Sequence, residues 1–231
     1  MIELFPQGFE EAEGPEGVEL AAYTDASGEE RLRAVFEGTS SADVVEDWAD
    51  RWRAFHRPVR IGPVWIGPPW EERPADAVTV VIDPGRAFGT GGHPTTRLCI
   101  ELLLGLRPES LLDLGCGSGV IAIAAAKLGF EPVFGFDIEG QAVEATLRNA
   151  AANGVRIDAR LGDALTALLP ETAVVVANIE IAAVSALAPR LPAATAIVSG
   201  YVESELPQLP AFAHLERRTL DGWAADLFGR E

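Results

Sequence analysis

The sequence predicts an α/β protein whose main domain is a doubly wound, mostly parallel sheet. The 231 residues are 48% hydrophobic, as expected for a globular chain with a substantial core. From Ala77 onward, apolar runs alternate with stretches of helical periodicity, a pattern typical of parallel strands joined by right-handed crossovers. The expected strands are 78–82, 110–115, 132–137, 155–161, 173–179 and 194–199. The expected helices are 94–105, 119–129, 140–152, 181–190 and a short one at 203–208.

The two ends of the chain depart from this alternation. A turn separates residues 214–222 from 223–230, which predicts a terminal hairpin that completes the sheet in antiparallel fashion. Residues 1–57 are expected to form a small α+β module, and residues 77–231 the ligand-binding domain. Prolines and glycines fill 58–76, which predicts an edge strand followed by a stiff linker. In the module, strand-like runs lie at 2–5, 18–23 and 32–37, and helical spacing begins at about Ala42.

Charge and composition exclude several classes of protein. The chain has 18 Lys and Arg against 35 Asp and Glu, a net charge of −17, which argues against direct nucleic-acid binding because that requires a basic surface. The two cysteines, Cys99 and Cys116, form no CxxC pair and indicate neither a disulfide framework nor a zinc site. No signal peptide and no membrane-spanning run is apparent. We therefore expect a soluble cytoplasmic protein that uses no metal and contacts no membrane.

The strongest local signal is the segment LLDLGCGSGVIAIAAAKLG at 111–129. A strand leads directly into Gly115, Gly117 and Gly119 and then into an apolar helix. Glycines let the backbone turn sharply and approach a ligand, and the helix N-terminus behind them offers free N–H groups. The spacing is G-x-G-x-G rather than the G-x-G-x-x-G of dinucleotide-binding proteins, which favours a methionine-bearing nucleoside over a pyrophosphate. A glycine-rich turn made only for packing is the alternative.

Asp137 ends the next strand, 22 residues after Gly115. An acid at this place is positioned to accept hydrogen bonds from both hydroxyls of a ribose. Ile138, which follows it, is expected to pack on the face of an adenine. Asp137 as a cap of the helix that begins near Gly140 is the alternative, and the two roles are compatible.

Two further polar residues follow strands of the predicted sheet. Asp163 comes after the strand expected at 155–161 and is expected to meet the adenine amino group, although Gly-Asp is also an ordinary helix N-cap. Asn178 ends a fully apolar strand, so it should lie at the carboxyl edge of the sheet where doubly wound folds bind ligands. A turn-forming Asn is the alternative there.

The segment IDPGRAFGTGGHPTT at 82–96 is too rich in Gly and Pro for a core element. Its Phe88, Thr90, His93, Thr95 and Thr96 offer a ring and several hydroxyls on a pliable backbone, so we expect a loop that folds over a ligand at the sheet edge. His93 has no companion cluster that would indicate a metal.

These segments together resemble the PrmA family, the methyltransferases of large-subunit ribosomal protein eleven. The resemblance rests on DPGRAFGTGGHPTT, DLGCGSGVIAIAAAKLG, DIEGQAVEATLRNAAANGV and VVVANI, and it extends over roughly residues 43–230. It implies a Rossmann-like class I methyltransferase with a mostly parallel seven-stranded sheet behind a small, truncated α+β N-terminal domain. The departures are Gly92, where the family usually has threonine, and Glu180–Ile181–Ala182 after the Asn-Ile pair.

The resemblance also implies a cofactor, a partner and roles for individual residues. S-adenosyl-L-methionine is the expected cofactor, contacted by Thr96, Gly115, Asp137 and Asn178. We expect Asn178 to orient the acceptor amine as well, and Phe88 to shape the path of the methyl group. The expected partner is a basic protein substrate, a large-subunit ribosomal protein, drawn by the acidic N-terminal module through complementary charge.

Three other functions stay open on the sequence alone. A methyltransferase of the same architecture could act on a small molecule or on another protein. A nicotinamide-dependent oxidoreductase is disfavoured by the glycine spacing and by the single lysine, Lys127. A non-catalytic nucleotide-binding module would bind S-adenosylmethionine without methyl transfer.

Overall fold

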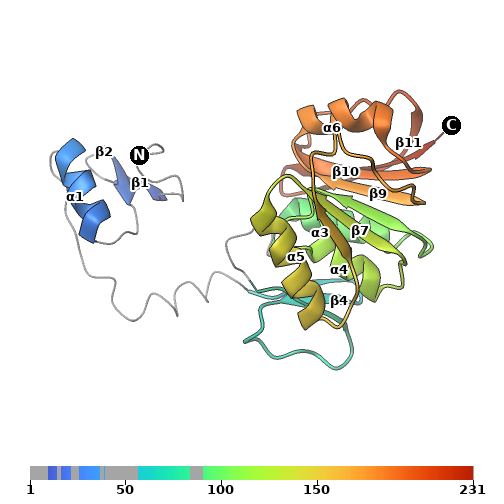
Figure 1. Ribbon diagram of the computed structural model, residues 1–231, viewed down its shortest axis with the longest axis horizontal. Helices are drawn as coiled ribbons and strands as arrows, with labels where there is room; N and C mark the ends of the chain where they lie inside the picture. The colour runs from blue at the N-terminus through green and yellow to red at the C-terminus, as the bar shows by residue number, and fades with distance from the viewer. Residues whose placement is uncertain are drawn as a thin grey trace. The chain divides into compact units, whose positions relative to one another are not determined.

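The computed structural model describes residues 10–14, 17–21, 26–36, 39, 57–83 and 91–230. The chain divides into two compact units, Met1–Arg51 and Trp52–Glu231, and each is described by itself. Figure 1 shows the elements of both units. No helix among the described residues is long and apolar enough to cross a membrane.

In the first unit the described residues form a short hairpin and one helix. Strand β1 (Glu10–Gly14) pairs antiparallel with β2 (Gly17–Ala21), and α1 (Ala26–Val35) follows. The strand predicted at 32–37 is wrong, because most of it lies in α1. Good helix formers in ASGEERLRAV and an ion pair of 2.6 Å between Arg33 and Glu29, one turn apart, favour the helix. The strand predicted at 2–5 and the helix from about Ala42 lie outside the described residues.

The second unit is built on a seven-stranded sheet with the order β11-β12-β10-β9-β6-β7-β8. The strands from β8 to β10 are parallel, and β12 runs antiparallel to both of its neighbours, as predicted for the terminal hairpin. A two-residue Asp221–Gly222 turn with positive φ at both residues closes this hairpin. The strands are β6 (Leu111–Leu114), β7 (Val133–Asp137), β8 (Asp158–Leu161), β9 (Val174–Asn178), β10 (Thr195–Val202), β11 (Phe212–Leu220) and β12 (Trp223–Arg230).

Helices cover both faces of this sheet, and the fold is the predicted doubly wound, Rossmann-like one (Figure 1). Successive residues of β9 alternate between two cores, with Val174 and Val176 in one and Val175 and Ala177 in the other. The helix predicted at 203–208 is wrong: residues 203–204 form a turn and 205–209 have no regular structure, because Pro207 and Pro210 oppose a helix. On one face lie α3 (Pro94–Leu103), α4 (Val120–Lys127) and α5 (Gly140–Ala152); on the other lie α6 (Ile181–Leu187) and the 3₁₀ turn η1 (Ala188–Arg190).

A separate three-stranded sheet stands where a linker was predicted. Strand β3 (Val59–Ile61) pairs antiparallel with β4 (Val64–Gly67), which pairs parallel with β5 (Val78–Val81). The predicted edge strand is present as β3, but β4 stands where a stiff connector was predicted, because Gly62 and Pro63 form a tight turn between two strands. The run 78–82 was expected in the main sheet, but as β5 it extends this smaller one. Buried Val64, Ile66 and Val80 belong to the same core as Leu98 of α3.

Candidate functional site

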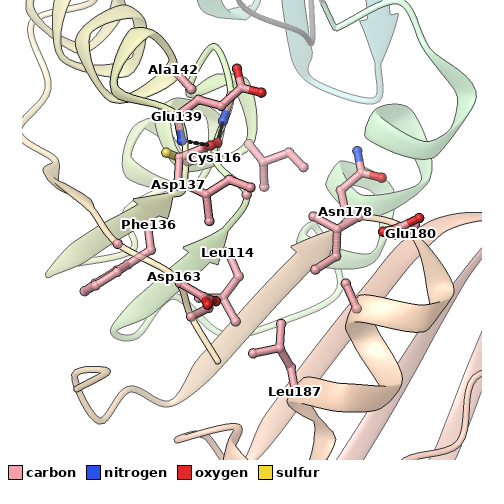
Figure 2. Close-up of a pocket in the computed structure, with 18 of the residues that line it drawn as sticks. Leu114, Cys116, Phe136, Asp137, Glu139, Ala142, Asp163, Asn178, Glu180 and Leu187 are labelled. Carbon is pink, nitrogen blue, oxygen red and sulfur yellow. Dashed lines mark hydrogen bonds between the residues drawn. The ribbon is translucent and has the colours of Figure 1, made fainter. Parts of the chain in front are cut away.

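A cavity of about 430 Å³ opens at the carboxyl ends of β6, β7 and β9 (Figure 2). Seven of the eight predicted site residues line it, and the eighth, Phe88, lies outside the described residues. We call one wall the glycine-loop side; it consists of Gly115, Gly117, Asp137, Ile138 and Asp163. We call the other wall the Asn178 side; it consists of Thr96 and Asn178. Figure 2 shows Asp137 and Asn178 on opposite sides of the cavity.

The glycine loop joins β6 to α4 through backbone that other residues rarely adopt. Gly115, Gly117 and Gly119 all have positive φ, at 73°, 54° and 82°. A Cβ at Gly119 would lie 3.0 Å from the Cα of Thr146 in α5, so the loop packs directly on that helix. Positive φ at all three positions, together with the close packing at Gly119, explains why glycine stands at each of them.

Asp137 anchors the glycine loop and faces the cavity at the same time. Its Oδ2 accepts a hydrogen bond of 2.9 Å from the backbone N–H of Gly117, and its Oδ1 accepts one of 3.0 Å from the backbone N–H of Glu139. Glu139 is the N-cap residue of α5, so Asp137 supports the helix start without being its cap. A carboxylate has about four acceptor positions. Two therefore stay available for hydroxyl groups in the cavity.

Asp163 holds its own turn. Its Oδ1 accepts a hydrogen bond of 2.8 Å from the backbone N–H of Leu165, and its carbonyl accepts from Ala167 at 2.7 Å. No helix begins there, so Asp163 stabilises a turn and is not a helix N-cap. Ile138 and Leu165 stand beside it on the cavity wall and are exposed over 72% and 43% of their surfaces. Exposed apolar side chains gathered at a cavity mouth are typical of a ligand site.

On the Asn178 side, a strand end meets the first turn of α3. The Asn178 amide donates to the hydroxyl of buried Thr96 at 3.4 Å. The helix begins at Pro94 after His93, whose Nδ1 lies 2.7 Å from the hydroxyl of Thr95. One donor position and the oxygen of the Asn178 amide stay available for a ligand.

Trp223 is a residue of this region that the sequence did not single out. Its ring meets that of His93 edge to face, with centroids 4.7 Å apart. Burial lowers the pKa of His93, so the imidazole is neutral at pH 7. Trp223 reaches this place because β12 runs antiparallel to β10, which brings the start of β12 to the carboxyl edge of the sheet. The sequence at the start of a strand does not indicate which strand it will pair with, so the position of Trp223 could not be predicted.

Buried ionisable groups lie beneath the glycine loop. Burial raises the pKa of Asp113 to about 7; the hydrogen bond from Ala122 N opposes this and the charge of Asp137 adds to it. Burial likewise raises the pKa of the Cys116 thiol to about 12, with a smaller contribution from the charge of Asp113. Cys116 lines the cavity, but as a neutral thiol it is unreactive at physiological pH.

Comparison with known proteins identifies relatives of this chain. The family described as ribosomal protein L11 methyltransferase (PrmA) matches residues 17–220. The ribosomal protein L11 methyltransferase of Shewanella piezotolerans is 42% identical over 183 residues, and that of Tolumonas auensis is 43% identical over 180. These alignments cover 72% and 71% of this chain, and the chain spans 60% of the length of either relative.

A solved structure has the same fold. The crystal structure of the ribosomal protein L11 methylase from Lactobacillus delbrueckii subsp. bulgaricus is 28% identical and superposes with a TM-score of 0.70. The match covers 76% of this chain and all of the other.

Proposed function

Because this chain belongs to the ribosomal protein L11 methyltransferase (PrmA) family, we propose that it is an S-adenosylmethionine-dependent protein N-methyltransferase that methylates amino groups of a large-subunit ribosomal protein. The observation that carries the proposal is the single cavity that unites a glycine loop, an acid at the next strand end and an Asn on the facing wall.

The residues present fit the cofactor. A cavity of about 430 Å³ is within the usual range for small ligands. The two unused acceptor positions of Asp137 suit the two ribose hydroxyls, and exposed Ile138 and Leu165 suit the faces of an adenine. Asp163 lies on the same wall and would reach the adenine amino group. Gly115 and Gly117 would leave room for the methionine portion beside the loop.

The Asn178 side would hold the acceptor amine. S-adenosylmethionine supplies a methyl group on a sulfonium that is itself the leaving group. The protein therefore has to hold a neutral amine in line rather than provide elaborate acid–base chemistry. A lysine amine has a pKa of about 10.4 in water, so desolvation within the site must favour its neutral form. The free oxygen of the Asn178 amide would accept from that amine and orient its lone pair, and Phe88 is proposed to border the same path.

Charge supports a basic protein as the substrate. Residues 1–57 contain 14 acids and 5 arginines, and the whole chain carries −17. A field of this sign attracts a basic partner and repels nucleic acid. The curated relatives named above are called ribosomal protein L11 methyltransferases, which supports the same class of substrate.

A labelling experiment tests the proposal. The protein is incubated with methyl-labelled S-adenosylmethionine and purified large-subunit ribosomal proteins, and cofactor binding is measured by calorimetry. We expect label in one basic ribosomal protein. Binding without label in any protein would instead support a small-molecule substrate or a nucleotide-binding module, and absence of binding would refute the cofactor assignment.

A further inference from the structure

Strand β10 contains a bulge next to Asn178. Residues Ser199 and Tyr201 pair with consecutive residues of β12, which leaves Gly200 as the extra residue. Gly200 has a φ of 104°, a conformation that favours glycine. Bulges of this kind re-aim the chain where they occur, so the bulge places β10 in a defined position against its parallel neighbour β9.

The bulge lies directly against the residue that follows Asn178. A Cβ added at Gly200 would clash with the carbonyl oxygen of Ile179 and would lie 2.6 Å from its carbonyl carbon. The backbone N–H of Ile179 donates to the carbonyl of Ser199 at 3.0 Å. On the other side, a Cβ at Gly115 would lie 2.5 Å from Cγ2 of Ile179. Ile179 is thus held between two glycines, and its position fixes that of Asn178.

Buried polar groups hold the bulge in place. The Ser199 hydroxyl donates to the carbonyl of Ala224 at 2.6 Å. The Tyr201 hydroxyl lies 2.9 Å from the carbonyl of Val198 and 2.7 Å from Oδ2 of Asp226. These contacts span the two residues on either side of Gly200, so the bulge cannot shift without breaking them.

Asp226 is the centre of this group, and its side chain is fully buried. Its carboxylate accepts two hydrogen bonds of 2.9 Å from Arg217 and lies 2.7 Å from Nε2 of His214. Burial alone would raise the pKa of Asp226, but the hydrogen bonds from Arg217, Tyr201 and His214 outweigh it and lower the pKa. A buried ion pair stabilises a fold no better than well-packed apolar residues of similar volume. Its presence beside the bulge therefore suggests a geometric role.

We propose that Gly200, Tyr201 and Asp226 are positioning residues that set the place of the Asn178 side chain. The inference rests on the proposed function, in which Asn178 orients the acceptor amine. These residues therefore govern the rate of methyl transfer more than the affinity for S-adenosylmethionine. Gly200 lies against Ile179, the residue after Asn178, Tyr201 and Asp226 hold the bulge that contains Gly200, and none of the three lines the cavity.

Steady-state kinetics and calorimetry test this with matched variants. Gly200→Ala should lower kcat at least tenfold, and Tyr201→Phe, which removes only a hydroxyl, by about threefold to tenfold, since misplacement of reacting groups is costly. The Kd for S-adenosylmethionine should change by less than about threefold. Gly154→Ala is the control, because Gly154 also has positive φ, at 66°, but has no atom within 4 Å of an added Cβ. Its kcat and its Kd for S-adenosylmethionine should match those of wild type.

A second measurement does not require the enzyme to be active. The side-chain amide resonances of Asn178, identified by their loss in Asn178→Asp, should shift in Gly200→Ala and Tyr201→Phe and stay in place in Gly154→Ala. Unshifted resonances, or a loss of cofactor affinity as large as the loss of kcat, would overturn the inference. If wild type methylates no protein, the proposed function fails while these spectra still decide the positioning role. If Gly200→Ala does not fold, Tyr201→Phe decides it.

Discussion

The glycine-loop side and the Asn178 side of the cavity differ in how the chain assembles them. Most of the first comes from one continuous segment, in which Asp113, the glycines and Asp137 follow each other within 25 residues. The second joins the first turn of α3 to the end of β9, and the bulge at Gly200 and the start of β12 pack next to these elements. A local segment can be read along the sequence, whereas a wall assembled from distant elements depends on strand pairing.

The two sides also differ in how a buried carboxyl group near each of them is hydrogen-bonded. Asp113, behind the glycine loop, accepts a hydrogen bond from Ala122 N, and its Oδ1 has no partner among the residues that the structure describes. Asp226, behind the Asn178 side, is contacted by three side chains. Their pKa values accordingly move in opposite directions, upward for Asp113 and downward for Asp226. Solvation by protein donors, rather than burial as such, decides whether a buried carboxyl is charged.

The largest expected effect is on the pH dependence of stability. The pKa of Asp113 is about 7 in the folded protein and about 4 in an unfolded chain. Because the folded value is the higher one, its contribution is fully present below about pH 4 and is lost as pH rises to about 7, on the order of 4 kcal/mol. Asp113→Asn mimics the neutral acid and should remove this loss. Urea unfolding at a series of pH values measures it.

Asp226→Asn is the comparison for that experiment. The folded pKa of Asp226 is lowered, so its stabilisation is present above the ordinary carboxyl range and lost as pH falls through the folded value. The variant should therefore lose stability at neutral pH, where Asp113→Asn gains it. Equal pH profiles for the two variants would show that the contrast between the two sides is wrong.

The next largest effect concerns Asp137. Asp137→Ala should weaken binding of S-adenosylmethionine by about 100-fold or more, because two hydrogen bonds to a charged acceptor are lost. The Gly117 and Glu139 N–H groups would also lose their acceptor. Calorimetric titration measures the change. An unchanged Kd would show that Asp137 only supports the start of α5 and does not bind the ribose.

A smaller effect is expected from a residue behind the glycine loop. The Asn149 amide donates to the carbonyl of Ser118 at 2.8 Å and accepts from the backbone N–H of Asp83 at 3.3 Å. Asn149→Asp keeps the size but replaces the donor by a charge, so the loop should shift and the Kd for the cofactor rise by about tenfold. Calorimetry measures that change.

Asn153, the C-cap residue of the same helix, is the matched control. It is buried as well, but its side chain hydrogen-bonds to the backbone of Val81 and to the carbonyl of Asn149, not to the glycine loop. Asn153→Asp should cost similar thermal stability without a comparable change in Kd. If both variants weaken cofactor binding equally, the effect is general destabilisation and not positioning of the loop.

The sequence predicted the glycine-loop side more completely than the Asn178 side. The family resemblance and the mostly parallel seven-stranded sheet are confirmed. Asp137 could be placed because strand, loop and helix follow one another, and Asn178 because it ends an apolar strand. Trp223 and Gly200 could not, because their positions depend on antiparallel pairing and on a bulge. The edge strand predicted in 58–76 is present as β3, but β4 was missed since Gly and Pro mark a tight turn as well as a connector.

The smallest expected effect is that of salt, which should change KM for the protein substrate more than Kd for the cofactor. A basic protein substrate would be attracted by the negative charge of the chain, to which residues 1–57 contribute 14 acids against 5 arginines. Attraction between charges in solvent is screened beyond about 8 Å at physiological ionic strength. Raising the ionic strength should therefore raise KM for the protein substrate by about threefold to tenfold. The Kd for S-adenosylmethionine should change less, because its contacts lie within the cavity and at short range. Methylation assays and calorimetry at low and high salt measure both. A KM that does not change with ionic strength would favour a compact substrate that binds within the cavity. It would also show that the acidic N-terminal residues do not contribute to substrate binding.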